Sequence, residues 1–235
     1  MKEINHNIKT GKTMEIDIQK KVLEVNDTEA DSNRKYFKDK NVFVLNMMSS
    51  PGSGKTEILC RTLAKLMPGI RVGVVVGDIC TTNDADRLEV TGAKVTQINT
   101  DQFGGDCHLA AHLIIASAKQ LGCEDLDLLI VENIGNLVCP AEFDIGEDTK
   151  VVVLSVTEGE DKPLKYPLMF RVADVAILNK IDLLPYLDFD AKLVVDNMKQ
   201  VHPHLPVFEM SAKTEEGFES WIEWVKIKVF EKTGK

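Results

Sequence analysis

Apolar and polar positions follow one another in blocks that predict alternating strands and helices. Seven short apolar runs, several of them rich in β-branched residues, have the length and composition of buried strands. They cover residues 42–48, 71–77, 94–98, 126–131, 151–156, 174–178 and 207–210. Helical spacing follows several of them, as in the closing segment with Trp221, Ile222, Val225 and Val229. We therefore expect a three-layer α/β fold with a mostly parallel sheet of about seven strands and helices on both faces.

The first 39 residues precede this alternation and form a predicted extension. Their apolar residues could give one or two helical turns; these are Ile16, Ile18, Val22, Leu23 and Val25. We expect residues 1–39 to be partly helical and to pack on the domain or on a partner subunit. Residues 40–235 should form one domain that is large enough to bury a full core.

A loop of small residues follows the first apolar run and leads into a helical pattern. It reads Ser49-Ser50-Pro51-Gly52-Ser53-Gly54-Lys55-Thr56. A strand, a glycine-rich turn, Lys-Thr and a helix are typical of a P-loop, in which backbone N–H groups bind phosphates. Lys55 should reach the terminal phosphates and Thr56 should hold Mg²⁺, with Gly52, Ser53, Gly54 and Glu57 completing the nucleotide contacts. Ser49 stands where the usual pattern begins with glycine.

Acidic residues stand at the ends of two predicted strands, where ligands of parallel sheets bind. Asp78 is a candidate for Mg²⁺ binding or water positioning. Glu132 lies three residues before Gly135, a spacing that resembles the γ-phosphate-sensing segment of GTPases with a P-loop. Most GTPases carry aspartate at this position, so Glu132 favours the dimerising branch of the P-loop proteins over the Ras-like branch. Asp84 is either a helix cap or a site residue, and Asp86 is a surface residue.

A guanine-binding pattern follows the sixth predicted strand as Asn179-Lys180-Ile181-Asp182. The Asp182 carboxylate can accept from both N–H groups on the edge of guanine, whereas adenine offers no such donor pair. Asn179 and Lys180 should orient and cover the base. Ser211-Ala212-Lys213, after the last strand, resembles the second loop that contacts guanine. We therefore expect GTP and GDP as ligands.

Cysteine and histidine gather at two places that suit a metal ion. Cys107, His108 and His112 stand at the start of one predicted helix, where His108 and His112 would share a face. Cys139 follows the segment that should respond to the nucleotide. Thiolate and imidazole suit Zn²⁺ or Ni²⁺, and a second chain could complete a tetrahedral site. The spacing alone equally allows a core cysteine beside a helix-capping histidine.

Composition narrows the functional classes. A net charge of −9 and a pI near 5.1, without a dense basic block, argue against nucleic acid as the main ligand. No apolar run reaches membrane-spanning length and the polar start is unlike a secretory signal, so we expect a cytoplasmic protein. Five scattered cysteines indicate thiols or metal ligands, not a disulfide framework.

Taken together, these motifs resemble the HypB family of hydrogenase nickel-incorporation GTPases. The matching segments are Gly52 to Thr56, Gly77-Asp78, Thr82 to Arg87, Cys107-His108-Leu109, Glu132 to Pro140, Gly159 to Pro167 and Asn179 to Asp182.

The resemblance implies a GTP-dependent homodimer that hydrolyses GTP and carries nickel or zinc at the subunit interface. The implied interface ligands are Cys107, His108 and Cys139, with His112 secondary; Lys55, Thr56, Asp78 and Glu132 are the catalytic candidates. The resemblance also implies two partners, a nickel-binding co-chaperone and the hydrogenase large subunit. Lys162 or Lys165 is the candidate for a group that acts on the partner's nucleotide.

Two other functions are compatible with these motifs. One is a regulatory GTP switch whose zinc is structural. The other is a urease-activating GTPase, which the Cys107-His108 pair and the 159–167 stretch disfavour.

Overall fold

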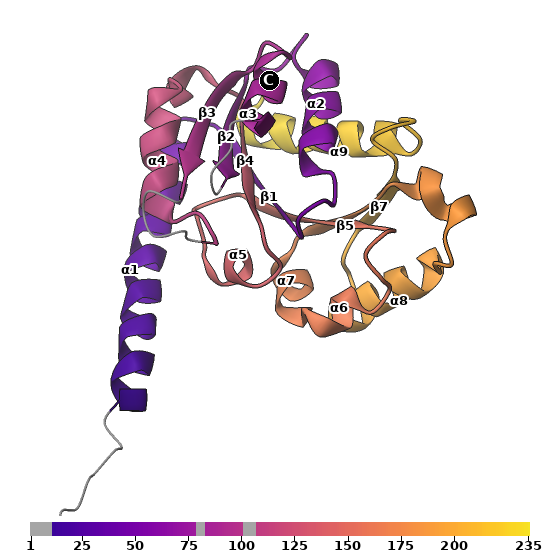
Figure 1. The fold of residues 1–235 in the computed structure, drawn as a ribbon. Helices are drawn as coiled ribbons and strands as arrows, with labels where there is room; N and C mark the ends of the chain where they lie inside the picture. Colours follow the sequence, from indigo (N-terminus) through magenta and orange to yellow (C-terminus); the bar gives the residue numbers. More distant parts are fainter. Residues whose placement is uncertain (1–10, 79–82, 101–106) are drawn as a thin grey trace, which may run out of the picture.

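A single parallel sheet organises the part of the chain that the structure describes. The computed structural model describes residues 11–78, 83–100 and 107–235, so the expectations for residues 1–10 lie outside it. Within those residues, seven strands form one sheet in the order β3-β2-β4-β1-β5-β6-β7, and every neighbouring pair is parallel (Figure 1). The expected α/β fold is confirmed.

The strands begin and end close to the predicted positions. Their bounds are β1 Phe43–Ser49, β2 Val72–Asp78, β3 Lys94–Asn99, β4 Leu128–Gly135, β5 Thr149–Ser155, β6 Val175–Asn179 and β7 Val207–Met210. Only the end of β4 differs much, because the strand continues through Glu132 and Asn133 to Gly135. Both polar side chains are buried and hydrogen-bonded, to Thr56 and Asn46 respectively, so they remain in the sheet.

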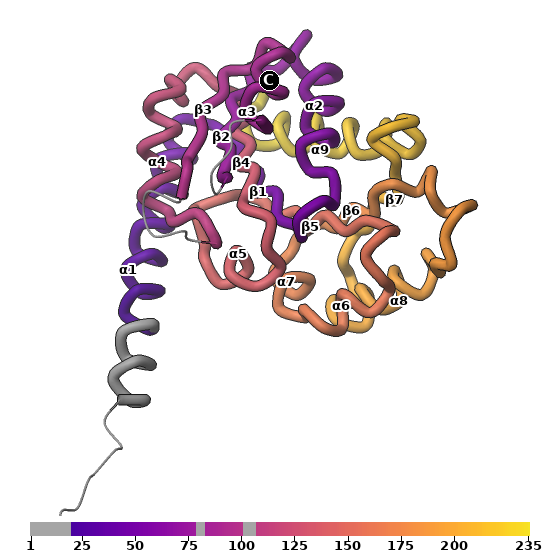
Figure 2. The backbone as a smooth tube through the Cα atoms, in the orientation of Figure 1, coloured from indigo at the N-terminus to yellow at the C-terminus, as the bar shows by residue number. Residues whose placement is uncertain are grey.

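Helices cover both faces of the sheet. Their bounds are α1 Gly11–Asp39, α2 Lys55–Leu66, α3 Asn83–Glu89, α4 Ala111–Gln120, α5 Cys139–Glu142, α6 Lys162–Lys165, α7 Pro167–Val172, α8 Ala191–Val201 and α9 Phe218–Thr233. The side chains of β1 alternate between the faces: Leu45 packs in a core with α2 and α9, and Val44 packs in another with α1 and α4. A third core joins α7 and α8 to β5 and β6. The backbone of these four elements can be followed in Figure 2.

Helix α1 runs beside α4 and is longer than the sequence pattern suggested (Figure 1). Val22 and Val25, two of the apolar residues in that pattern, are 51% and 60% exposed. A different stripe of α1 is buried, and it consists of Asn26, Ala30, Asn33 and Phe37. These positions follow the spacing of one helix face, but half of them are asparagines, which apolar periodicity does not detect. None of the helices in the described residues is long and apolar enough to cross a membrane.

An ion pair fixes the start of β4 at the amino edge of the sheet. Asp127, 7% exposed, accepts hydrogen bonds from Arg71 Nε at 2.9 Å and from the Arg71 guanidinium NH2 at 2.8 Å. It also accepts from the Arg71 backbone N–H at 3.1 Å and from Lys235 Nζ at 3.1 Å. The Arg71 bonds hold the pKa of Asp127 well below its usual range.

We expect Asp127→Asn to lower the free energy of unfolding at pH 7 by about 1–2 kcal/mol, since Arg71 is partly exposed and solvent screens the pair. A carboxyl with a depressed folded pKa stabilises the fold above its unfolded pKa of about 3.9, and this stabilisation is lost as pH falls toward the folded value. The difference from the unmodified protein should therefore shrink below about pH 4. Urea unfolding at pH 7 and below about pH 4 measures this difference in the free energy of unfolding. The same change at exposed Asp125, Asp125→Asn, is the control. A difference that does not change with pH would contradict the assignment.

Candidate nucleotide and metal sites

A cavity of about 460 Å³ lies at the carboxyl edge of the sheet, where the P-loop lies between β1 and α2. Its lining gathers most of the residues that the sequence assigned to phosphate and Mg²⁺. They are Gly52, Ser53, Gly54, Lys55, Thr56, Glu57, Asp78 and Glu132. Lys180 also borders the cavity.

The P-loop requires glycine at two positions. Gly52 and Gly54 have φ of 77° and 97°, a left-handed conformation that strains other residues. A Cβ on Gly54 would lie 2.6 Å from Asn179 Nδ2, so the base-binding motif fits directly against this backbone. The close approach exists because Asn179 Nδ2 donates to Ser53 O at 2.9 Å and Lys180 Nζ donates to Gly52 O at 2.7 Å.

Lys55, Thr56 and Glu132 are three buried residues that form one corner of this cavity. Thr56 Oγ1 donates to Glu132 Oε1 at 2.7 Å, and Lys55 Nζ donates to Ser49 Oγ at 2.6 Å. Burial lowers the pKa of Lys55. Burial raises the pKa of Glu132 to about 7, although the positive charge of Lys55 opposes the rise.

The buried side chains of this cavity suit a Mg²⁺ ion and the phosphate groups of a bound nucleotide. Glu132 Oε2 and Ser53 Oγ are buried without a hydrogen-bond partner. Hydroxyl and carboxylate oxygens are the ligands that Mg²⁺ prefers, so Thr56 and Glu132 could hold it directly or through water. A bound polyphosphate would satisfy Ser53 and offset the charge of Lys55.

The two predicted base-binding loops are hydrogen-bonded to each other. Ser211 Oγ donates to Asp182 Oδ1 at 2.6 Å, and the Ala212 N–H donates to Asn179 Oδ1 at 3.2 Å. Asp182, Ser211, Ala212 and the exposed Lys213 do not line the phosphate cavity. They lie beyond Asn179, which bonds to both the P-loop and Ala212.

The two candidate cysteines come together from separate elements. Cys107 lies before α4, Cys139 is the first residue of α5, and their thiols are close enough to hydrogen-bond. Burial, followed by this contact, raises the pKa of Cys139 to about 11, and Asn136 Nδ2 approaches its Sγ at 3.5 Å. A soft metal ion fits two adjacent thiols, which lose their protons on binding.

The two histidines do not share a helix face, and that prediction is wrong. Helix α4 begins at Ala111, so His108 lies in the segment before it. The His108 ring stacks on Phe143 with centroids 3.6 Å apart, beside α5. His112 points to α1, where its Nδ1 lies 3.4 Å from Glu29 Oε2. Within the described ranges, no three His, Cys, Asp or Glu side chains are grouped as one chain's metal site would need.

Comparison with known proteins identifies the relatives of this chain. Residues 43–209 match the family model described as CobW/HypB/UreG, nucleotide-binding domain. The chain is 50% identical over 212 residues to the hydrogenase maturation factor HypB of Rhizobium leguminosarum bv. viciae, covering 90% of this chain and 70% of that one. The chain belongs to the HypB family of hydrogenase maturation factors.

Two solved HypB structures share this architecture over most of the chain. The Archaeoglobus fulgidus HypB superposes with a TM-score of 0.82 at 36% identity, over 88% of this chain and 99% of that one. Helicobacter pylori HypB, solved in complex with nickel, gives a TM-score of 0.80 at 40% identity, over 88% and 95%. The resemblance drawn from the motifs is confirmed.

Two residues of this HypB family member line or support the nucleotide cavity without having been predicted. Arg87 of α3 lines it and pairs with Glu57 Oε2 at 2.5 Å. Glu158 accepts hydrogen bonds from the hydroxyl of Ser50 in the P-loop and from the Ser155 N–H at 2.9 Å. Arg87 lies in a matched motif, Thr82 to Arg87, but its orientation depends on Glu57, which the motif does not contain. Asp84, left open by the sequence, lies in the first turn of α3 and also lines the cavity.

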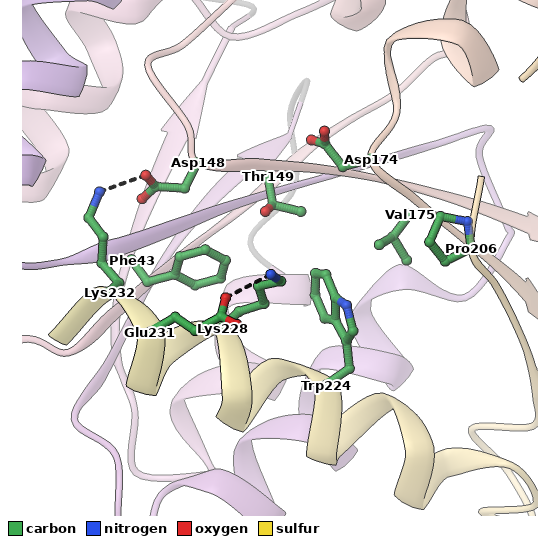
Figure 3. Close-up of a pocket in the computed structure, with 10 residues that line it drawn as sticks. All are labelled: Phe43, Asp148, Thr149, Asp174, Val175, Pro206, Trp224, Lys228, Glu231 and Lys232. Atoms are coloured by element: carbon green, nitrogen blue, oxygen red, sulfur yellow. Dashed lines mark hydrogen bonds and ion pairs between the residues drawn. The ribbon is translucent and has the colours of Figure 1, made fainter. Parts of the chain in front are cut away.

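A second cavity, of about 550 Å³, lies at the opposite, amino edge of the sheet (Figure 3). Phe43 and Trp224 form its apolar part. Four of its charged side chains form two pairs: Lys232 Nζ donates to Asp148 at 2.6 Å and Lys228 Nζ donates to Glu231 at 2.7 Å. The HypB family motifs all lie away from this cavity, so we assign it no catalytic role.

We expect Asp182→Asn to reverse the base preference. The amide would place a donor against the N–H groups of guanine, whereas xanthine has a carbonyl there. Competition binding of GTP and XTP should show the preference for GTP falling by roughly a hundredfold or more. The same change at exposed Asp188 is the matched control and should leave the preference intact. An Asp182→Asn protein that still preferred GTP would remove Asp182 from base recognition.

Proposed function

We propose that this HypB family member is a GTP-hydrolysing metallochaperone that delivers nickel during [NiFe]-hydrogenase maturation. One observation carries the proposal: the nucleotide-facing end of β4 and a candidate metal thiol lie four residues apart. Gly135 ends β4 and packs so closely on the P-loop that a Cβ there would lie 3.1 Å from Pro51 Cα. Cys139 then begins α5. A movement of Gly135 with the γ-phosphate would therefore displace Cys139.

Hydrolysis would use groups that already surround the cavity. Lys55 would neutralise charge on the transferring phosphoryl group, Thr56 would hold Mg²⁺, and Asp78 and Glu132 would position Mg²⁺ or water. Thr56 and Glu132 would hold Mg²⁺, which would supply positive charge that stabilises the transferring phosphoryl group. We propose that a second copy adds a positive group, with Lys162 and Lys165 as the candidates because both belong to α6, which follows the carboxyl end of β5.

The metal site is proposed to lie between two copies in a GTP-dependent homodimer. Cys107, His108 and Cys139 provide two thiolates and an imidazole, which leaves a tetrahedral ion one ligand short in each chain. A symmetric dimer would repeat the same surface and could supply the missing ligands. The solved Helicobacter pylori HypB contains nickel, and this supports nickel as the cargo here. A nickel-binding co-chaperone and the hydrogenase large subunit would be the donor and the recipient.

Metal and nucleotide affinity should be coupled through Cys139. Titration of Ni²⁺ into the GDP-bound and GTP-analogue-bound protein should give affinities that differ ~5–150-fold, and Ni²⁺ must change the nucleotide affinity by the same factor. Cys139→Ala should abolish the coupling and leave GTP binding nearly intact. Half-buried Cys60 on α2 supplies the control, Cys60→Ser, which should retain the coupling. Equal Ni²⁺ affinity in the two nucleotide states would instead support a switch with a structural ion.

GTP turnover per subunit should rise with protein concentration across the dimerisation range, because the second copy is proposed to contribute to the site. Lys162→Ala and Lys165→Ala identify the contributing group, and Lys55→Ala should eliminate turnover at every concentration. Lys192→Ala, which changes an exposed lysine of α8, is the control. Turnover that is independent of concentration would exclude the contribution in trans.

A further inference from the structure

Two buried asparagines of α1 contact both of the segments that carry the candidate metal ligands. Asn26 and Asn33 lie seven positions apart, about two helical turns, so they project from one face of α1. Their exposed fractions are only 4% and 3%. Burying an amide costs free energy unless it is hydrogen-bonded, so the partners of these two side chains explain their presence.

The first partner is Ala111, the residue that begins α4. Its N–H donates to Asn26 Oδ1 at 3.0 Å, and its carbonyl accepts from Asn33 Nδ2 at 2.7 Å. Both backbone groups of one residue are thus held by α1. Ala111 lies three positions after His108, so these bonds also restrict where Cys107 and His108 can lie.

The second set of partners lies in the segment after α5. Asn26 Nδ2 donates to Asp144 O at 2.7 Å, and Asn33 Nδ2 donates to Ile145 O at 3.1 Å. Arg34 adds an ion pair with the Asp144 carboxylate at 2.6 Å. Asp144 is five positions after Cys139, so α1 also holds the segment that carries this thiol.

Backbone packing strengthens the same contact. Gly146 has φ of 86°, and a Cβ there would lie 2.6 Å from both Ala30 O and Asn33 Cβ. The loop therefore approaches the α1 backbone more closely than any residue with a side chain could. The position of the loop relative to α1 is fixed by shape as well as by hydrogen bonds.

We propose that α1 is a positioning element of the metal site, in which Asn26 and Asn33 set the separation between Cys107-His108 and Cys139. The inference rests on the proposed function, because it takes those three residues as metal ligands. Each ligand segment is a connection outside the sheet, and such segments lose conformational freedom when they bind an ion. Hydrogen bonds to one rigid helix restrict both ligand segments before the ion binds. This raises the affinity for the ion without any contact between α1 and the metal.

A simpler role for Asn26 is to cap α4. Ala110, the N-cap residue of α4, offers no side-chain hydrogen bond, and Asn26 supplies one from another helix. Asn26→Asp separates the two roles. A carboxylate keeps the acceptor for the Ala111 N–H, but it loses the donor to Asp144 O. If capping were the whole role, Asn26→Asp would leave the metal site unchanged.

Ni²⁺ titration of the full chain, followed by thiolate-to-nickel charge-transfer absorption, tests the proposal. We expect Asn26→Asp and Asn33→Ala to weaken Ni²⁺ binding by about 10-fold or more and to alter the absorption band. GDP affinity should remain within about twofold, since neither residue touches the nucleotide cavity. Asp127→Asn is the matched control, because it destabilises the opposite edge of the sheet and should leave Ni²⁺ affinity unchanged.

Ni²⁺ binding that is unchanged in Asn26→Asp and Asn33→Ala overturns the proposal. Cys139→Ala in the same titration shows which inference fails. If Cys139→Ala loses Ni²⁺ while the asparagine variants keep it, only the positioning role is wrong; if Cys139→Ala also keeps it, the proposed ligand set is wrong as well.

If the asparagine variants do not fold, Arg34→Gln tests the positioning role instead, because it leaves both asparagines in place. It should weaken Ni²⁺ binding on the order of threefold, and no change would overturn the proposal.

Discussion

The side-chain amide of Asn179 holds the nucleotide edge of this protein together. Its Nδ2 donates to the P-loop at Ser53 O and its Oδ1 accepts from the Ala212 N–H, so one buried residue joins the P-loop to a predicted base-binding loop. The P-loop conformation depends on the same contact, since Gly54 leaves just enough space for the amide. The P-loop and the predicted base-binding loops are therefore joined by direct hydrogen bonds, and the movement proposed for the γ-phosphate response is assigned to Glu132 and Gly135.

The sequence predicted the elements of the fold and the order of the nucleotide motifs well. Buried parallel strands are nearly continuous apolar runs, and this signal is local. The end of β4 was missed because Glu132 and Asn133 are polar, and polarity at a strand position indicates solvent unless a buried partner is known. Thr56 and Asn46, which supply those partners, lie far away in the sequence.

The candidate metal ligands show the limit of predictions from local spacing. His108 and His112 suit one helix face only if the helix includes both, and the start of α4 at Ala111 separates them. That start is stabilised by Asn26, 85 residues away, and no pattern around His108 could indicate it. Arg87 was missed for the same reason, because Glu57 in another helix directs it.

The contacts of α1 have a consequence for the order in which the chain folds. Asn26 and Asn33 are separated from Asp144 and Ile145 by 118 and 112 positions, and contacts of this sequence separation form late. During synthesis, α1 emerges before the segments that it contacts, and its bonds to Asp144 and Ile145 cannot form until the segment through Gly146 has left the ribosome. With Cys107 and Cys139 as the proposed ligands, a nascent chain that already exposes Cys107 would lack these bonds, which hold the segment that carries Cys139. With the proposed ligand set, a partly synthesised copy that lacks Asp144 and Ile145 would therefore be a poor competitor for scarce metal.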